Sequence, residues 1–213
     1  MDVKILERKV AIIMGADYRI GQTVAELFAE EGASVVLIAR EKKKLEKTVE
    51  GIRKKGGKAV GIVVDTCFEK DARKIMRETR KIFGTLDILV NNTADTIGQK
   101  MINEALKIFM PKNQGTIINI FMEKKHSCYG SANILIKNVL GTLTKNVAMK
   151  LMDTDIQCNA VTSKVSVTSE HLAHFPEPEC EAIDQAYACL YLASKMGKAV
   201  RGEVLQIHNG TFL

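Results

Sequence analysis

Short runs of β-branched and other apolar residues alternate along this chain with longer segments of helical periodicity, and this alternation constrains the fold more than any other feature. The short runs are apolar on successive residues, which is typical of strands buried on both faces. Such strands occur in parallel sheets whose two faces are covered by helices. The alternation therefore predicts an α/β fold with a doubly wound parallel sheet of about seven strands and helices on both faces.

The expected elements follow one another without a linker, repeat or low-complexity tract. The runs that predict strands are 10–13, 35–38, 60–64, 86–90, 116–121, 156–161 and 204–207. The segments that predict helices are 21–32, 41–55, 69–83, 102–110, 131–151 and 180–194. We therefore treat residues 1–213 as a single domain.

Composition excludes two broad classes of protein. Of the 213 residues, 46% are hydrophobic, which is enough for a sizeable core and too many for a disordered chain. No window supplies the roughly 18 uninterrupted apolar residues of a membrane span. The N-terminal stretch carries charges such as Lys4 and Glu7 where a secretory signal needs apolar residues. We expect a cytoplasmic protein with no membrane partner.

The formal net charge of +6 does not point to nucleic acid. Basic and acidic residues are interleaved, aromatic residues make up only 5%, and there is no Trp to stack on bases. We expect no nucleic-acid partner and a small polyanionic ligand instead. The five cysteines are widely spaced and contain no C-x-x-C pair, so we expect reduced, mostly buried thiols and no metal site.

The turn after the first expected strand carries Gly15 and Gly21 ahead of an expected helix. Glycines in such a turn let the backbone approach a pyrophosphate, and the helix N-terminus adds free N–H groups and a partial positive charge. An ordinary strand-to-helix turn is the alternative interpretation, because two glycines alone are weak evidence.

Arg40 follows the second expected strand. A site selective for NAD places an acid on the ribose 2′-OH at this point, whereas an arginine offers a fork for a 2′-phosphate. We therefore expect NADP(H) to be favoured over NAD(H). The lysines at 42–44 that follow are interpreted as a solvated helix face.

These motifs and several later ones resemble the short-chain dehydrogenase/reductase family over nearly the whole chain. The first turn keeps Gly15, Ile20 and Gly21 of the family's T-G-x-x-x-G-I-G pattern. Further matches are Asp65, Asn91-Asn92-Thr93-Ala94, Ile117-Ile118-Asn119-Ile120, Leu143-Thr144-Lys145 and residues 156–161. Each match is weak alone, but their order and spacing together are specific.

The resemblance implies a Rossmann fold that binds NAD(P) and a family activity of hydride transfer between NADP(H) and a carbonyl or alcohol substrate. Asp65 falls where the family holds the adenine amino group, and Thr168 keeps the place of a threonine that follows the sixth strand. The cofactor-binding positions carried over are Gly15, Arg19, Ile20, Gly21, Arg40, Asp65, Asn91, Lys137 and Thr168.

The catalytic positions depart from the family pattern. The family uses a tyrosine, acidified by a lysine four residues later, as its proton donor. Counting back without gaps from the Leu143 motif puts Lys137 at the lysine and Asn133 at the tyrosine. An amide is no general acid near neutral pH. Phe121 and Met122 stand where the family has its serine, so the resemblance implies impaired catalysis.

Two further departures affect the site. The segment 95–113 is shortened by roughly twenty residues relative to the family, so we expect most of one helix and its catalytic asparagine to be missing. The family forms dimers through that helix, so the implied homodimer or homotetramer should have an altered interface. Arg19 replaces the middle glycine of the first turn and either blocks the pyrophosphate or binds it by charge.

Tyr129 is the candidate for a displaced proton donor. It lies eight residues before Lys137, which leaves the two about 80° apart on an ideal helix. Divergent enoyl reductases of this superfamily separate the two residues by seven, and a tyrosine that precedes the helix swings more freely. A tyrosine that only packs in a loop is the alternative. Ser127 and His126 lie in the same segment.

Three functional hypotheses follow. The first is an NADP-leaning member of the family with defective catalytic machinery. The second is an active reductase that uses Tyr129 and Lys137 on a small carbonyl or enoyl substrate. The third is a non-catalytic nucleotide-sensing or scaffold subunit that pairs with a complete homologue.

Overall fold

The computed structural model describes residues 4–17, 19–64, 69–92, 97–122, 130–163 and 182–207. Its centre is one seven-stranded sheet with the order β3-β2-β1-β4-β5-β6-β7, in which every neighbouring pair is parallel. The strands are β1 (Val10–Met14), β2 (Ser34–Ala39), β3 (Lys58–Val63), β4 (Ile88–Asn91), β5 (Gln114–Met122), β6 (Asp155–Ser163) and β7 (Val204–Ile207). The sheet confirms the predicted architecture.

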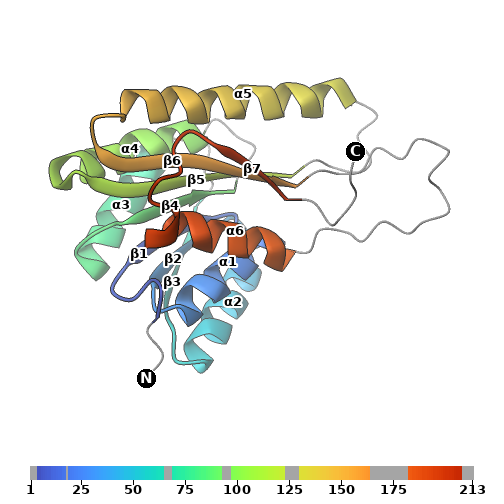
Figure 1. Ribbon diagram of the computed structural model, residues 1–213. Helices are drawn as coiled ribbons and strands as arrows, with labels where there is room; N and C mark the ends of the chain where they lie inside the picture. The colour runs from blue at the N-terminus through green and yellow to red at the C-terminus, as the bar shows by residue number, and fades with distance from the viewer. Residues whose placement is uncertain are drawn as a thin grey trace.

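Helices cover both faces of the sheet (Figure 1). In the described part of the chain they are α1 (Arg19–Glu30), α2 (Lys42–Lys54), α3 (Glu69–Phe83), α4 (Ile97–Lys112), α5 (Gly130–Lys150) and α6 (Ala182–Ala193), with a short 3₁₀ helix, η2 (Lys195–Gly197). α1, α2 and α6 pack on one face, and α3, α4 and α5 pack on the other. None of these helices is long and apolar enough to span a membrane.

The alternation of side chains along each strand creates two hydrophobic cores. In β1, Ala11 and Ile13 belong to the core beneath α1, whereas Ile12 and Met14 belong to the core beneath α3 and α4. All five residues of β1 are buried, as a central parallel strand requires. The unbroken apolar runs of the sequence therefore reflect two cores, one on each face.

The strand order places a switch point next to β1. The chain passes from β1 to β2 and β3 on one side and then returns to β4 on the other side of β1. In open sheets of this kind, ligands bind in the crevice that opens at the carboxyl ends of the strands beside such a reversal. The carboxyl ends of β1, β2 and β4 meet at this edge.

α4 is longer than expected, and the expectation that most of this helix is missing was wrong. It runs over sixteen residues, from Ile97 to Lys112, and includes Pro111 in its last turn. The helix expected at residues 102–110 ended before the proline. In the structure the helix continues through Pro111, which lacks one N–H donor, and ends one residue later. Lys112 anchors the end, because its Nζ lies 2.8 Å from Oδ1 of Asp87 and also donates to the carbonyl of Leu86.

Candidate functional site

The turn between β1 and α1 depends on its two glycines. Gly15 has a φ of +65°, a left-handed conformation that side chains rarely adopt, and a Cβ there would lie 2.5 Å from the backbone oxygen of Asn92. A Cβ on Gly21 would lie 2.2 Å from the carbonyl oxygen of Gly15. The first turn of α1 therefore lies directly on the backbone of the strand-to-helix turn, which accounts for both glycines physically.

Hydrogen bonds tie this turn to the strands on either side of β1. The N–H of Ala16 donates to the carbonyl of Ile38 at 3.2 Å. On the other side, Nδ2 of Asn92 donates to the carbonyl of Gly15 at 3.4 Å. A third bond runs from the N–H of Glu41 to Oδ2 of Asp17 at 3.3 Å. The turn is thus held at the edge where β1, β2 and β4 all end.

α1 begins at Arg19 and presents the features of an anion site. Its first turn contains no acidic residue, and its first N–H groups have no partner within the helix. Arg19 is exposed, so its guanidinium lies outside the core at this edge. Ile20 is only 2% exposed and packs into the core, so only its backbone is available to a ligand. Free N–H groups, the helix dipole and a cation together favour a negatively charged group.

Arg40 is exposed at the end of β2 and has no ion-pair partner among the described residues. The acid next to it, Glu41, is paired with Lys44 at 2.7 Å, and Lys42 lies 3.7 Å from Glu46. Because these neighbouring acids are paired with lysines, Arg40 remains as a cation at the edge of the crevice.

Asn91 is the last residue of β4, and its side chain lies toward Asn119 of the neighbouring strand β5. The residue is 4% exposed, and its Nδ2 donates to Oδ1 of Asn119 at 3.0 Å. Nδ2 of Asn119 in turn donates to Oγ1 of Thr144 in α5 at 2.9 Å. The buried Oδ1 of Asn91 has no hydrogen-bond partner among the residues that the structure describes. The result is a chain of amides that links β4, β5 and α5 beneath the crevice.

The contribution of Asn119 to this chain of amides had a signal in the sequence. An asparagine inside the run Ile117-Ile118-Asn119-Ile120 has to find polar partners, because a buried amide without hydrogen bonds is costly. The resemblance places Thr144 in the Leu143-Thr144-Lys145 motif, but its bond to Asn119 depends on how α5 packs across β5.

The two described cysteines are unreactive by environment. Burial raises the pKa of Cys158 to about 12, although a hydrogen bond from Asn119 acts in the opposite direction. Burial likewise raises the pKa of Cys189. Both are free and buried, which confirms the expected thiols at these two positions. Cys67, Cys128 and Cys180 lie outside the described residues.

The expected catalytic residues are only partly described. Lys137 and Asn133 lie in α5, but only their backbone belongs to the described part of the chain. Tyr129, Asp65, Thr168, Ser127 and His126 lie outside it. Phe121, at the position where the resemblance implies a serine, is 7% exposed and shares a strand face with Asn119. The described residues hold no group of three or more His, Cys, Asp or Glu suited to a metal ion.

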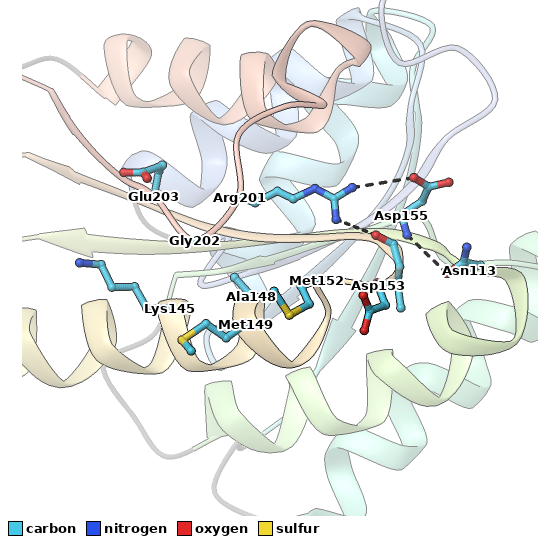
Figure 2. Close-up of a pocket in the computed structure, with 11 residues that line it drawn as sticks. Asn113, Lys145, Ala148, Met149, Met152, Asp153, Asp155, Arg201, Gly202 and Glu203 are labelled. Atoms are coloured by element: carbon cyan, nitrogen blue, oxygen red, sulfur yellow. Dashed lines mark hydrogen bonds and ion pairs between the residues drawn. The ribbon is translucent and has the colours of Figure 1, made fainter.

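A separate hollow of about 720 Å³ opens at the opposite edge of the sheet (Figure 2). Lys145, Ala148 and Met149 of α5 form one wall, and the residues that precede β6 and β7 form the others. Arg201 crosses it to donate to the carbonyl of Thr154 at 2.6 Å and lies 3.8 Å from Asp155. Because it lies where strands begin, this hollow is not the crevice beside Gly15.

Comparison with known proteins identifies relatives of the whole chain. The family model for short chain dehydrogenase matches residues 9–104. An uncharacterized oxidoreductase of Bacillus subtilis, YhxC, is 28% identical over 247 residues, which cover 99% of this chain and 87% of that protein. The peroxisomal 2,4-dienoyl-CoA reductase of Arabidopsis thaliana is 27% identical, with 98% of this chain and 86% of that protein covered.

The fold has close counterparts among solved structures. The crystal structure of a hydroxysteroid dehydrogenase from Escherichia coli superposes with a TM-score of 0.85 at 23% sequence identity. The superposition covers 97% of this chain and 98% of that one. At this identity the match concerns the fold alone.

Proposed function

The chain belongs to the short-chain dehydrogenase family, and from this premise we propose that it binds a nicotinamide dinucleotide in the crevice beside β1, with NADP(H) favoured over NAD(H). One observation carries the proposal. The glycine turn and the N-terminus of α1 lie at the switch point of the sheet, with Arg19 and Arg40 exposed there and no acid in the first turn of α1.

The residues present fit such a ligand. The backbone of Gly15, Ile20 and Gly21 would face the pyrophosphate, where Arg19 adds positive charge. Arg40 would take the 2′-phosphate through its guanidinium fork. Asp65, Asn91, Lys137 and Thr168 remain cofactor positions proposed from the family resemblance.

We propose further that hydride transfer is impaired. The bound cofactor would supply the hydride, and the protein has to orient the substrate and deliver a proton to its oxygen. Asn133 and Phe121 offer no proton donor and no hydroxyl at the two positions where the family has them. Lys137 alone would remain, with the role of holding the cofactor ribose.

An active reductase that uses Tyr129 is the second candidate, and one observation favours it. α5 begins at Gly130, so Tyr129 directly precedes in sequence the helix that carries Lys137. The separation of eight residues is one more than the seven found in divergent enoyl reductases of this superfamily.

Isothermal titration calorimetry with NADP(H) and NAD(H) tests the binding proposal. We expect NADP(H) to bind more tightly, and Arg40→Ala to remove about ten- to a hundredfold of that preference, because one charge-assisted contact contributes about 1.5–3 kcal/mol. Arg77→Ala removes an exposed arginine from α3 and is the matched control, for which we expect no change. Equal affinities for the two cofactors in the wild-type protein would contradict the preference, and no binding of either would contradict the proposed function.

A further inference from the structure

We propose that Asp17 is a positioning residue that sets the cofactor preference by holding the peptide bond between Arg40 and Glu41. This inference rests on the proposed function, because it concerns how Arg40 meets the 2′-phosphate. The side chain of Asp17 contacts backbone here, and no part of its role requires contact with the cofactor.

The contact joins two segments that are far apart in the sequence. Oδ2 of Asp17, in the turn after β1, accepts a hydrogen bond from the N–H of Glu41 at 3.3 Å across a separation of 24 residues. That N–H belongs to the same peptide unit as the carbonyl of Arg40. Rotation of this unit would redirect the Arg40 side chain, since the two share the backbone at residue 40.

The backbone on the other side of Arg40 is already fixed. Ala39 ends β2 in register with Val63, and its carbonyl accepts the N–H of Val64 at 3.1 Å. After Arg40, the carbonyl of Glu41 accepts the N–H of Leu45 as α2 begins. Glu41 is the N-cap of α2, yet its side chain makes no capping bond. Within the described residues, Asp17 is the side chain that secures the intervening peptide unit.

Asp17 itself stands on a rigid base, which a positioning residue needs. The turn that carries it is bonded to β2 through Ala16 and to the end of β4 through Asn92. Asp17 is also half-buried, so the carboxylate is less free to rotate away than a fully exposed one. The bond therefore transfers the fixed geometry of the first turn to the residue that follows β2.

The negatively charged carboxylate of Asp17 lies close to the proposed anion site. Its charge opposes a phosphate, and the hydrogen bond from Glu41 offsets part of that charge. The other acid of this loop, Glu41, is paired with Lys44. The groups of opposite charge on these segments are Arg19 and Arg40, both exposed. The bond and the charge of Asp17 thus act in opposite directions, and substitution separates them.

The test compares Asp17→Ala with Asp17→Asn, because the asparagine oxygen can still accept the bond but carries no charge. The measured quantity is the ratio of the dissociation constants for NAD⁺ and NADP⁺ in the full-length protein. We expect Asp17→Ala to lower this ratio about three- to tenfold through weaker NADP⁺ binding, and Asp17→Asn to stay within about twofold of the wild type. Glu31→Ala is the matched control. The side chain of Glu31 accepts a hydrogen bond from the N–H of Ile5 at 3.1 Å, and this bond lies away from the crevice.

Several results would overturn the inference. A higher ratio in both Asp17 variants would mean that charge repulsion dominates, and an equal fall in both would mean that the hydrogen bond is not what matters. An equal loss of affinity for both cofactors in Asp17→Ala would indicate a merely structural role. An unchanged ratio in both variants defeats this inference alone, whereas a wild-type protein that binds neither cofactor defeats the proposed function and this inference with it.

A second measurement needs no cofactor. Hydrogen exchange of the Glu41 amide in the free protein reports directly on the bond. We expect faster exchange in Asp17→Ala and near wild-type exchange in Asp17→Asn. Equal exchange in all three proteins would overturn the positioning role even if the protein binds NADP⁺.

Discussion

Gly21 shows how closely the backbone of α1 approaches the turn before it. A Cβ there would lie 2.2 Å from the carbonyl oxygen of Gly15, and the two nearest atoms both belong to the backbone of Gly15, which cannot move aside as a flexible side chain would. We expect Gly21→Ala to lower the free energy of unfolding by about 1–3 kcal/mol, as overpacking does in a closed site. Urea unfolding followed by circular dichroism measures the change.

Gly51 is the matched control for that substitution. It lies inside α2, and a Cβ there would meet nothing within 4 Å. Gly51→Ala should raise the free energy of unfolding by about 0.5–1 kcal/mol, because alanine favours the helix. Similar effects at the two positions would show that helix propensity, and not the close approach, governs Gly21.

Asn119 is the central member of the buried amide chain. Asn119→Ala would leave Oγ1 of Thr144 without its donor, and Nδ2 of Asn91 with only the 3.5 Å contact to the carbonyl of Gly98. We expect a loss of about 2–3 kcal/mol in the free energy of unfolding, the cost of buried polar groups without partners. Asn103→Ala, at an exposed amide that pairs with Gln99 on α4, should change it by less than about 0.5 kcal/mol. Comparable losses in the two variants would contradict the role assigned to the buried amides.

At the scale of the element, β6 carries a thiol whose environment makes stability depend on pH. Burial raises the pKa of Cys158 from the ordinary 9.0 to about 12. Between these values the unfolded chain loses the thiol proton and the folded chain keeps it, so the free energy of unfolding falls as pH rises above 9. The contribution is fully present below pH 9 and declines by about 1.4 kcal/mol per pH unit above it.

Urea unfolding of Cys158→Ala and the wild-type protein between pH 8 and about 10.5 measures this contribution. Other groups titrate in the same range, so the difference between the two proteins is the informative quantity. We expect the wild-type curve to fall more steeply than the curve of the variant above pH 9, with no difference in slope below it. Parallel curves throughout would mean that Cys158 titrates alike in the folded and unfolded chains.

Strands and helices were predictable because their hydrophobic patterns differ. β7 and α3 have the bounds expected from the sequence, and the other elements differ mainly at their ends. The start of α4 at Ile97 was missed, because the expected helix rested on apolar spacing that begins at residue 102. Its end was missed because Lys112 bonds to residues before β4, a tertiary contact that no local pattern contains.

At the scale of the whole molecule, the order of β1, β2 and β4 determines which residues meet at the crevice. The sequence indicated Gly15, Gly21 and Arg40 because each follows a predicted strand, and parallel strands bring their ends to one edge. It did not indicate Asp17, whose significance comes from a bond across 24 residues. It also did not indicate that the side chain of Asn91 turns into the sheet toward Asn119.

Catalysis depends on the whole assembly, because cofactor, β5 and α5 have to present a proton donor to one substrate oxygen. In the alignment that we propose, Asn133 in α5 takes the place of the family's tyrosine, and Phe121, buried near the end of β5, takes the place of its serine. Loss of general acid catalysis alone typically lowers a rate by about 10²–10⁴. We therefore expect NADPH oxidation with a panel of ketones, aldehydes and enones, followed at the absorbance of the reduced nicotinamide, to stay near background. Turnover at ordinary reductase rates that disappears in Tyr129→Phe would establish the displaced tyrosine instead, and turnover that persists in that variant would direct the search to Ser127, His126 or bound water.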